Sequence, residues 1–79
     1  MRRFTRRDLL AFNGKGGAPA YLACDGLVYD ATQSFQWQKG EHQVVHRAGE
    51  DLTLALAQAP HGTDLLARLP IVGVLVDEG

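Results

Sequence analysis

Residues 37–62, WQKGEHQVVHRAGEDLTLALAQAPHG, decide the fold of this chain and hold all three of its histidines, His42, His46 and His61. His42 and His46 stand four apart, which on a helix places them on neighbouring turns of one side. His61 follows after a second, strongly apolar segment. The stretch is therefore the first place to look for a functional site.

Length and composition point to one small domain spanning residues 1–79. At this size, folding hides only roughly 60% of the surface that the unfolded chain exposes, so the core is marginal. Such domains often depend on a disulfide, a metal, a partner or a large apolar cofactor. A disulfide within the monomer is excluded because Cys24 is the only cysteine. The apolar fraction of 46% and the charged fraction of 22% are those of a globular domain.

The charge pattern excludes a general affinity for nucleic acid, because the net charge is −1. Four of the eight basic residues fall within the first seven positions: Arg2, Arg3, Arg6 and Arg7. They suit a basic arm or an amphipathic membrane contact, but a solvated helix face is the more usual role, and we expect that one. No apolar run approaches the ~20 residues of a membrane span, and no apolar signal-peptide region follows Met1. A soluble, cytoplasmic protein is expected.

The first third of the chain predicts a short helix and a β-hairpin. Thr5 and Asp8 have the spacing of a capping box, which predicts a helix over residues 6–12, and the glycine-rich residues 13–17 predict a turn. Residues 21–24 and 27–29 are typical of two strands joined by a two-residue type I′ turn at positions 25 and 26. Within this hairpin Cys24 is predicted to be a small core residue.

The remaining chain predicts helices followed by a last strand. Residues 33–39 form an irregular connection, and residues 41–48 fit two helical turns. Asp51 is expected to cap an apolar helix over residues 52–59 that is covered on more than one side. A final helix over residues 63–69 leads to a β-branched strand over residues 71–76, which returns to pair with the hairpin. The fold class is α+β: a small sheet with two helical pairs.

The histidines favour a haem site over a zinc site. His61 lies between Pro60 and Gly62 at a helix junction, and two imidazoles facing each other across an apolar cleft suit the axial positions of haem iron. Zinc is the rival, but Gln43 stands where a His-Glu-x-x-His motif has its glutamate, and a fourth ligand is not evident. No activated nucleophile is evident either, because Ser34 is the only serine and nothing marks it as activated. We expect a protein that is not an enzyme.

Four motifs in order give the chain a resemblance to a known family. They are Val28-Tyr-Asp-Ala-Thr32, Ala48-Gly-Glu-Asp-Leu-Thr53, the histidine at position 61, and Ile71-Val-Gly-Val-Leu75. Together they resemble the cytochrome b5-like haem/steroid-binding domain over nearly the whole chain, in a short bacterial-type variant. The resemblance implies a cytochrome b5-like fold whose helical pairs enclose a cleft for haem b, with His61 as one axial ligand.

The chain departs from that family at the other axial ligand. The family's His-Pro-Gly-Gly motif is replaced by Trp37-Gln-Lys-Gly40. In this the chain is similar to the progesterone-receptor-like (MAPR) branch, which uses a tyrosine from a Gly-x-Tyr segment. With two extra residues before Ala48, Gly40-Glu41-His42 occupies that place, whereas an ungapped match puts Val44 there.

These observations lead to two alternative functions. The first is a small b-type electron carrier that serves a redox partner protein, with His61 and His42 on the iron. His46 then contacts the haem from further out or is exposed. Val44, Leu56 and Leu66 would form apolar walls and Trp37 would stand near the mouth. The second is an iron-free module of the same fold that binds a steroid-like or other hydrophobic ligand, or a partner protein.

Overall fold

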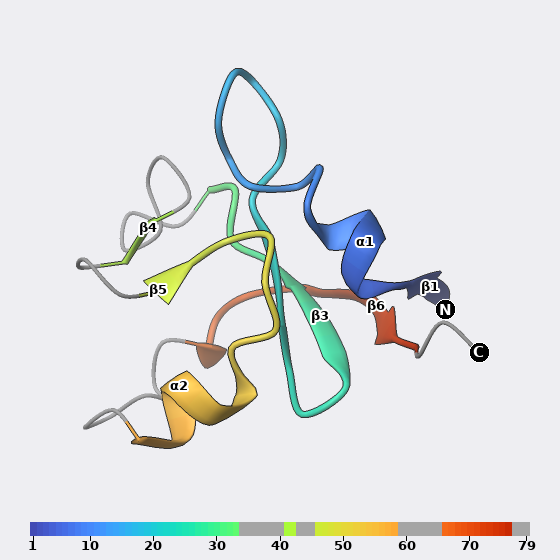
Figure 1. The fold of residues 1–79 in the computed structure, drawn as a ribbon, viewed down its shortest axis with the longest axis vertical. Coiled ribbons are helices and arrows are strands. Elements are labelled where there is room, and N and C mark those ends of the chain that lie inside the picture. The colour runs from blue at the N-terminus through green and yellow to red at the C-terminus, as the bar shows by residue number, and fades with distance from the viewer. Residues whose placement is uncertain (34–40, 43–45, 59–65, 77–79) are drawn as a thin grey trace.

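The computed structural model describes residues 1–33, 41–42, 46–58 and 66–76, and it has the predicted α+β character. Four strands form the main sheet in the spatial order β1, β6, β3, β2 (Figure 1). Two short strands form a separate ribbon, and two helices complete the described elements. The bounds are β1 (Arg2–Phe4), α1 (Arg6–Leu9), β2 (Tyr21–Cys24), β3 (Leu27–Asp30), β4 (Glu41–His42), β5 (His46–Arg47), α2 (Thr53–Gln58) and β6 (Ile71–Leu75).

The β2–β3 hairpin is confirmed where the sequence predicts it. Its antiparallel register runs from Tyr21 opposite Asp30 to Cys24 opposite Leu27. The two turn residues, Asp25 and Gly26, have φ values of 52° and 80°. A type I′ turn requires positive φ at both positions, so the Asp-Gly pair fixes the register of the hairpin.

Strand β6 occupies an inner position of the sheet. It pairs antiparallel with β3, which confirms the predicted return to the hairpin, and parallel with β1, which the sequence did not predict. Gly73 makes this pairing possible. A Cβ atom there would meet the carbonyl oxygen of Arg2 and would lie 2.6 Å from Cε1 of Phe4. The ring of Phe4 therefore occupies the space that a side chain at position 73 would need.

Helix α1 begins at the predicted capping box but is shorter than predicted. The backbone N–H of Asp8 donates to Thr5 Oγ1 at 3.1 Å, and the N–H of Thr5 donates to Asp8 Oδ2 at 2.9 Å. After Leu9 the chain continues in three-residue turns, with the Phe12 N–H donating to the Leu9 carbonyl at 2.9 Å. These tighter turns bring the Phe12 ring onto that of Tyr21, with 4.6 Å between the ring centroids.

The sheet separates two apolar clusters, because successive strand residues face opposite sides. Phe4, Leu9, Ala23 and Val28 are buried on one side. On the other side the buried residues are Ala20, Leu22, Cys24, Ala31, Ala48, Leu52 and Leu56. We call this second group the α2-side cluster. Cys24 belongs to it, as predicted.

The predicted helix over residues 41–48 is wrong. The described residues of this segment form β4 and β5, which pair antiparallel with Glu41 opposite Arg47 and His42 opposite His46. An apolar run this short matches either period, so pairing between strands decides the outcome. The fold therefore has a β-ribbon where one member of a helical pair was predicted.

Two further helix predictions need correction. Helix α2 begins at Thr53, one residue later than predicted, and is covered on one side only: Leu56 is 1% exposed but Leu54 is 76% exposed. The predicted helix over residues 63–69 appears in the described residues 66–69 only as a single turn, in which the Leu69 N–H donates to the Leu66 carbonyl at 3.0 Å. The predicted connection over residues 33–39 lies outside the described residues from position 34 onward. Among the described residues, no helix has the length and apolar character to cross a bilayer.

Candidate functional site

The segment between β5 and α2 is fixed to the edge of the sheet. The N–H of Gly49 donates to the Tyr21 carbonyl at 2.6 Å, and the N–H of Leu52 donates to the Ala23 carbonyl at 2.7 Å. Gly49 has a φ of 90°, and a Cβ atom there would lie 3.1 Å from the carbonyl oxygen of Leu9. Only glycine fits this close turn readily, which explains the Ala-Gly pair in the sequence.

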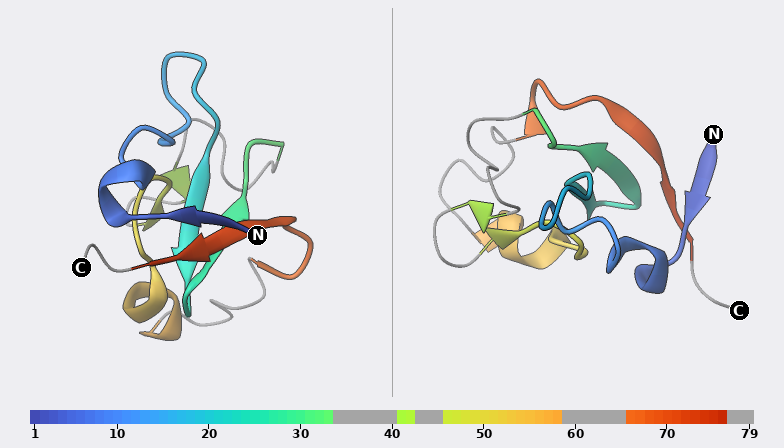
Figure 2. Two further views of the ribbon diagram at one scale, coloured as in Figure 1. Left: turned by 90° about the vertical axis from the view of Figure 1, so that its right-hand side faces the viewer. Right: turned by 90° about the horizontal axis from the view of Figure 1, so that it is seen from above.

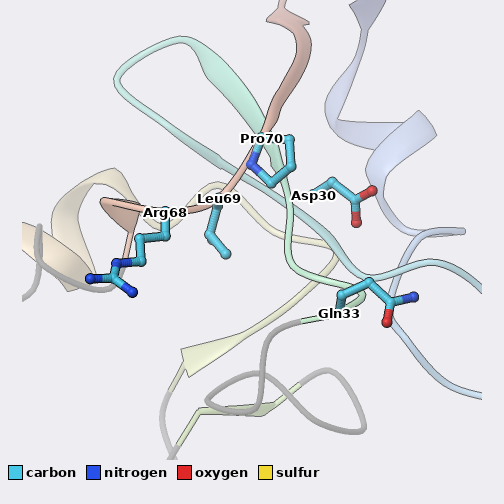
Figure 3. Close-up of a pocket in the computed structure, with 5 residues that line it drawn as sticks. All are labelled: Asp30, Gln33, Arg68, Leu69 and Pro70. Carbon is cyan, nitrogen blue, oxygen red and sulfur yellow. The ribbon is translucent and has the colours of Figure 1, made fainter.

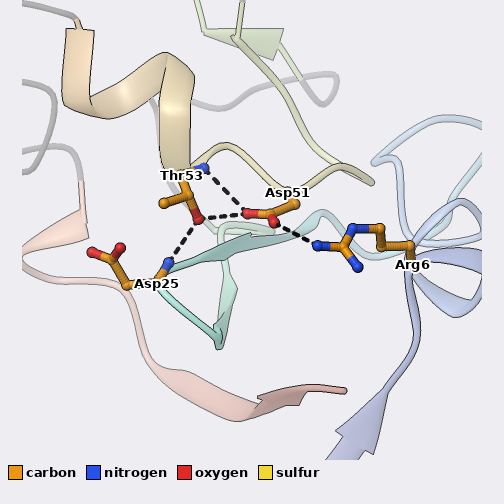
Figure 4. A network of polar contacts seen from close by, with 4 residues as sticks. All are labelled: Arg6, Asp25, Asp51 and Thr53. Carbon is orange, nitrogen blue, oxygen red and sulfur yellow. Dashed lines mark hydrogen bonds and ion pairs between the residues drawn. The ribbon is translucent and has the colours of Figure 1, made fainter. Parts of the chain in front are cut away.

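A polar network holds the first turn of α2 (Figure 4). Thr53 Oγ1 donates to Asp51 Oδ1 at 2.6 Å and accepts the N–H of Asp25 at 2.8 Å. Asp51 Oδ1 also accepts the N–H of Thr53 at 3.2 Å, so the predicted capping role of Asp51 is confirmed. On the outer side, Arg6 forms an ion pair with Asp51 Oδ2 at 3.3 Å. Helix α2 is thus tied to the hairpin turn and to α1.

The chain on both sides of His61 packs against the same apolar core. Leu56 of α2 is buried in the α2-side cluster, and Leu66 and Leu69 are half-buried against it. Residues 59–65, which include His61, lie between them and outside the described residues. Described residues before and after the segment that carries His61 therefore pack in or against one apolar cluster.

The other predicted site residues fall into two groups. His42 and His46 are direct partners across the β4–β5 ribbon, which the sequence did not predict. Their four-residue spacing thus reflects a tight β-ribbon and not one side of a helix. Trp37, Val44 and His61 lie outside the described residues.

A pocket of about 250 Å³ opens where β3 leaves the sheet and the chain returns to β6 (Figure 3). The described residues that line it are Asp30, Gln33, Arg68, Leu69 and Pro70. The N–H of Asp30 donates to the Pro70 carbonyl at 2.9 Å, which joins the two walls. Sequence reasoning missed this pocket, because its two walls come from segments that are far apart in the chain and meet only in the folded structure.

Cys24 is the buried thiol of the α2-side cluster. Burial raises its pKa above the ordinary value of 9.0, and the negative charges of Asp25 and Asp51 raise it further. The neutral thiol is therefore the stable form, which suits a core residue. Within the described part of the chain, no group of three or more His, Cys, Asp or Glu residues is placed to hold a metal ion.

Comparisons with known proteins identify the fold. The family model of the cytochrome b5-like heme/steroid binding domain matches residues 5–76. A solved cytochrome b5 domain protein from Hadesarchaea YNP_N21 is 54% identical, with a TM-score of 0.90 over 96% of this chain and 100% of that one. One from Methanococcoides burtonii is 45% identical, with a TM-score of 0.90 over 96% of this chain and 99% of that one.

A more distant structure shares the fold alone. A hypothetical protein from Arabidopsis thaliana, described as having a cytochrome b5-like fold, is 23% identical and has a TM-score of 0.72 over 96% of this chain and 92% of that one. A search of curated proteins finds no match.

Proposed function

Because this chain belongs to the cytochrome b5-like haem/steroid-binding domain family, we propose that it binds haem b and serves as a small electron carrier. His61 and His42 are the proposed axial ligands. The observation that carries the proposal is the packing on both sides of residues 59–65: Leu56 precedes them and Leu66 follows them, and both contact one apolar cluster. This packing supports a histidine held against an apolar surface, as a porphyrin requires.

The residues of this chain suit the roles that a bound haem would need. Leu56 and Leu66, together with Val44, supply apolar walls, and Trp37 is assigned to the mouth of the cleft. The network of Asp51 and Thr53 fixes the start of α2 and so limits where the following residues can lie. When bound, the haem supplies one-electron chemistry, and two imidazole ligands leave no open position on the iron. We therefore assign electron transfer to a partner protein and not an enzymatic reaction.

The choice of His42 over His46 rests on the sequence. Gly40-Glu41-His42 fits the place where the progesterone-receptor-like branch has its ligand, and this argument does not depend on helix geometry. The register that pairs His42 with His46 across the ribbon is compatible with a supporting role for His46, which stays part of the proposal.

An absorption spectrum of the haemin-loaded protein tests the proposal. We expect a sharp low-spin Soret band, its loss in His61→Ala and His42→Ala, and its retention in His46→Ala. The three variants are matched, because each removes one imidazole. Retention of the wild-type spectrum in His61→Ala would contradict the assignment. Loss in His46→Ala together with retention in His42→Ala would transfer the ligand role to His46.

A second candidate function is iron-free binding of a steroid-like or other hydrophobic ligand, or of a partner protein. The pocket beside Leu69 and Pro70 favours it, with Asp30 and Arg68 as polar groups at its walls. Its volume of about 250 Å³ is slightly below the roughly 300–1,000 Å³ of ligand pockets. A colourless protein that takes up no haemin, but whose melting temperature rises with a sterol, would establish this function instead.

A further inference from the structure

The positive charges of this chain are gathered at one end of the sequence. The first seven residues hold four arginines and no acidic residue, whereas the remaining 72 hold four basic and nine acidic residues. The chain as a whole carries a net charge of −1. A nearly neutral protein therefore has one strongly basic segment, and the proposed cofactor site does not use it.

The fold keeps this basic segment together. Strand β1 and helix α1 lie side by side at one end of the molecule, and α2 and the β4–β5 ribbon lie at the other (Figures 1 and 2). The guanidinium of Arg2 lies over the ring of Phe4, 4.4 Å from its centroid. Arg3 and Arg7 are exposed, and among the described residues neither has an ion-pair partner, since the ion pair found there joins Arg6 to Asp51.

An exposed apolar side chain accompanies the arginines. Leu10 is 65% exposed and has helical backbone angles at the end of α1. It follows Arg7 by three residues and Arg6 by four, which places it beside them on this turn. We call the set of Arg2, Arg3, Arg6, Arg7 and Leu10, which lie at the end of the molecule formed by β1 and α1, the arginine face; as successive strand residues, Arg2 and Arg3 project to opposite sides of β1.

Two acidic residues near the arginine face, Asp8 and Asp51, have hydrogen-bond or ion-pair partners within the protein. Asp8 accepts the N–H of Thr5 in the capping box, and Asp51 is paired with Arg6. Glu50 is exposed and lines a shallow pocket of about 260 Å³ together with Arg6 and Leu10. Among the described residues, Asp8, Glu50 and Asp51 thus place three carboxylates near the four arginines, which still outnumber them.

We propose that the arginine face docks on an anionic lipid surface. Arginine side chains pair with lipid phosphates, and an exposed leucine among them can enter the apolar boundary beneath the headgroups. The apolar residue favours lipid over an acidic protein. The position of the face also favours lipid over a redox partner. A redox partner bound there would lie at the end opposite α2 and the β4–β5 ribbon, which carries the proposed ligand His42. Docked in this way, the protein presents that opposite end to the aqueous phase.

Co-sedimentation with vesicles tests the proposal on the full chain, with or without haem. At low ionic strength we expect binding to phosphatidylglycerol vesicles and none to phosphatidylcholine vesicles. Each basic side chain near an anionic surface contributes roughly fivefold, so Arg7→Gln should lower the partition coefficient about fivefold and the Arg3→Gln/Arg7→Gln pair about 30-fold. Because salt of about 1 M shortens the screening length to roughly 3 Å, it should release the protein.

Matched variants separate this surface from general effects. Arg68→Gln removes one exposed arginine from another part of the chain and should leave binding unchanged. Leu10→Ser should weaken binding about tenfold through lost apolar burial, while Leu54→Ser, at an exposed leucine of α2, should not. Glu50→Gln should strengthen binding, because it removes a repulsive charge.

Two outcomes would overturn the proposal. One is the absence of binding to phosphatidylglycerol, or binding that Arg3→Gln/Arg7→Gln leaves intact. The other is equal binding to polyglutamate with no effect of Leu10→Ser, which would assign the face to an acidic protein. Because apo-protein serves equally well, failure of haem binding and failure of lipid binding are distinguishable.

Discussion

Thr53→Val tests whether the polar network holds helix α2. The substitution keeps the shape of the side chain but removes the hydroxyl, which donates to Asp51 at 2.6 Å and accepts the N–H of Asp25 at 2.8 Å. Each intramolecular hydrogen bond contributes roughly 0.5–1.5 kcal/mol net. The N–H of Asp25 is exposed and can donate to water instead. We therefore expect the free energy of unfolding to fall by about 2 kcal/mol, near the middle of the combined range for two hydrogen bonds. In a domain of this size, that corresponds to a fall of roughly 10 °C in the melting temperature.

Thermal and urea unfolding followed by circular dichroism measure this loss. Thr53→Ser is the matched control, since it keeps the hydroxyl and removes only a methyl group, and it should recover most of the stability. If Thr53→Val and Thr53→Ser unfold within about 0.5 kcal/mol of each other, the hydroxyl does not hold the helix and the reasoning fails.

Three further predictions concern the core. Gly73→Ala should lower the free energy of unfolding by about 3 kcal/mol, the upper end for overpacking, because a methyl group there meets the backbone of β1. A melting temperature within a few degrees of wild type would contradict the close approach. In urea unfolding, Leu56→Ala should lower the free energy of unfolding by roughly 2–5 kcal/mol and Leu54→Ala by less than about 0.5 kcal/mol. Equal losses in the two variants would contradict the one-sided burial of α2. Above pH 9 the unfolded chain releases the Cys24 proton while the folded chain retains it, so the free energy of unfolding should fall as the pH rises. Below pH 10, this slope should flatten in Cys24→Ala, and an unchanged slope would exclude the thiol as its source. Above pH 10 the Tyr29 hydroxyl, whose pKa is also raised, begins to contribute.

Local signals predicted the elements that local chemistry determines. The hairpin follows from Asp25 and Gly26, and the start of α1 follows from Thr5 and Asp8. Strand β1 was missed, because three residues that read Arg-Arg-Phe give no strand signal. Their conformation comes from pairing with β6, some 70 residues later.

The β4–β5 ribbon and α2 show where periodicity is insufficient. The run from His42 to Ala48 is short enough to satisfy either a helical or a strand pattern, and cross-strand pairing decides for strands. In α2, Leu54 and Leu56 look alike in sequence, but only Leu56 faces the cluster beneath the helix. Of the site, the sequence predicted the Asp51 cap correctly, while the role of His61, which lies outside the described residues, stays a prediction. The pocket at Asp30 and Arg68 depends on tertiary packing alone.

The position of β6 has a consequence for how this domain is made. A ribosome synthesises β6 after all the other strands, yet β6 pairs with both β1 and β3 inside the sheet. Until it emerges, β1 has no neighbour to pair with and the hairpin exposes an open edge. Pairing over so many residues makes closure slow relative to local hairpin formation. The nascent chain therefore acquires its hairpin early but can complete the sheet only when Ile71–Leu75 has left the exit tunnel, in a single late step.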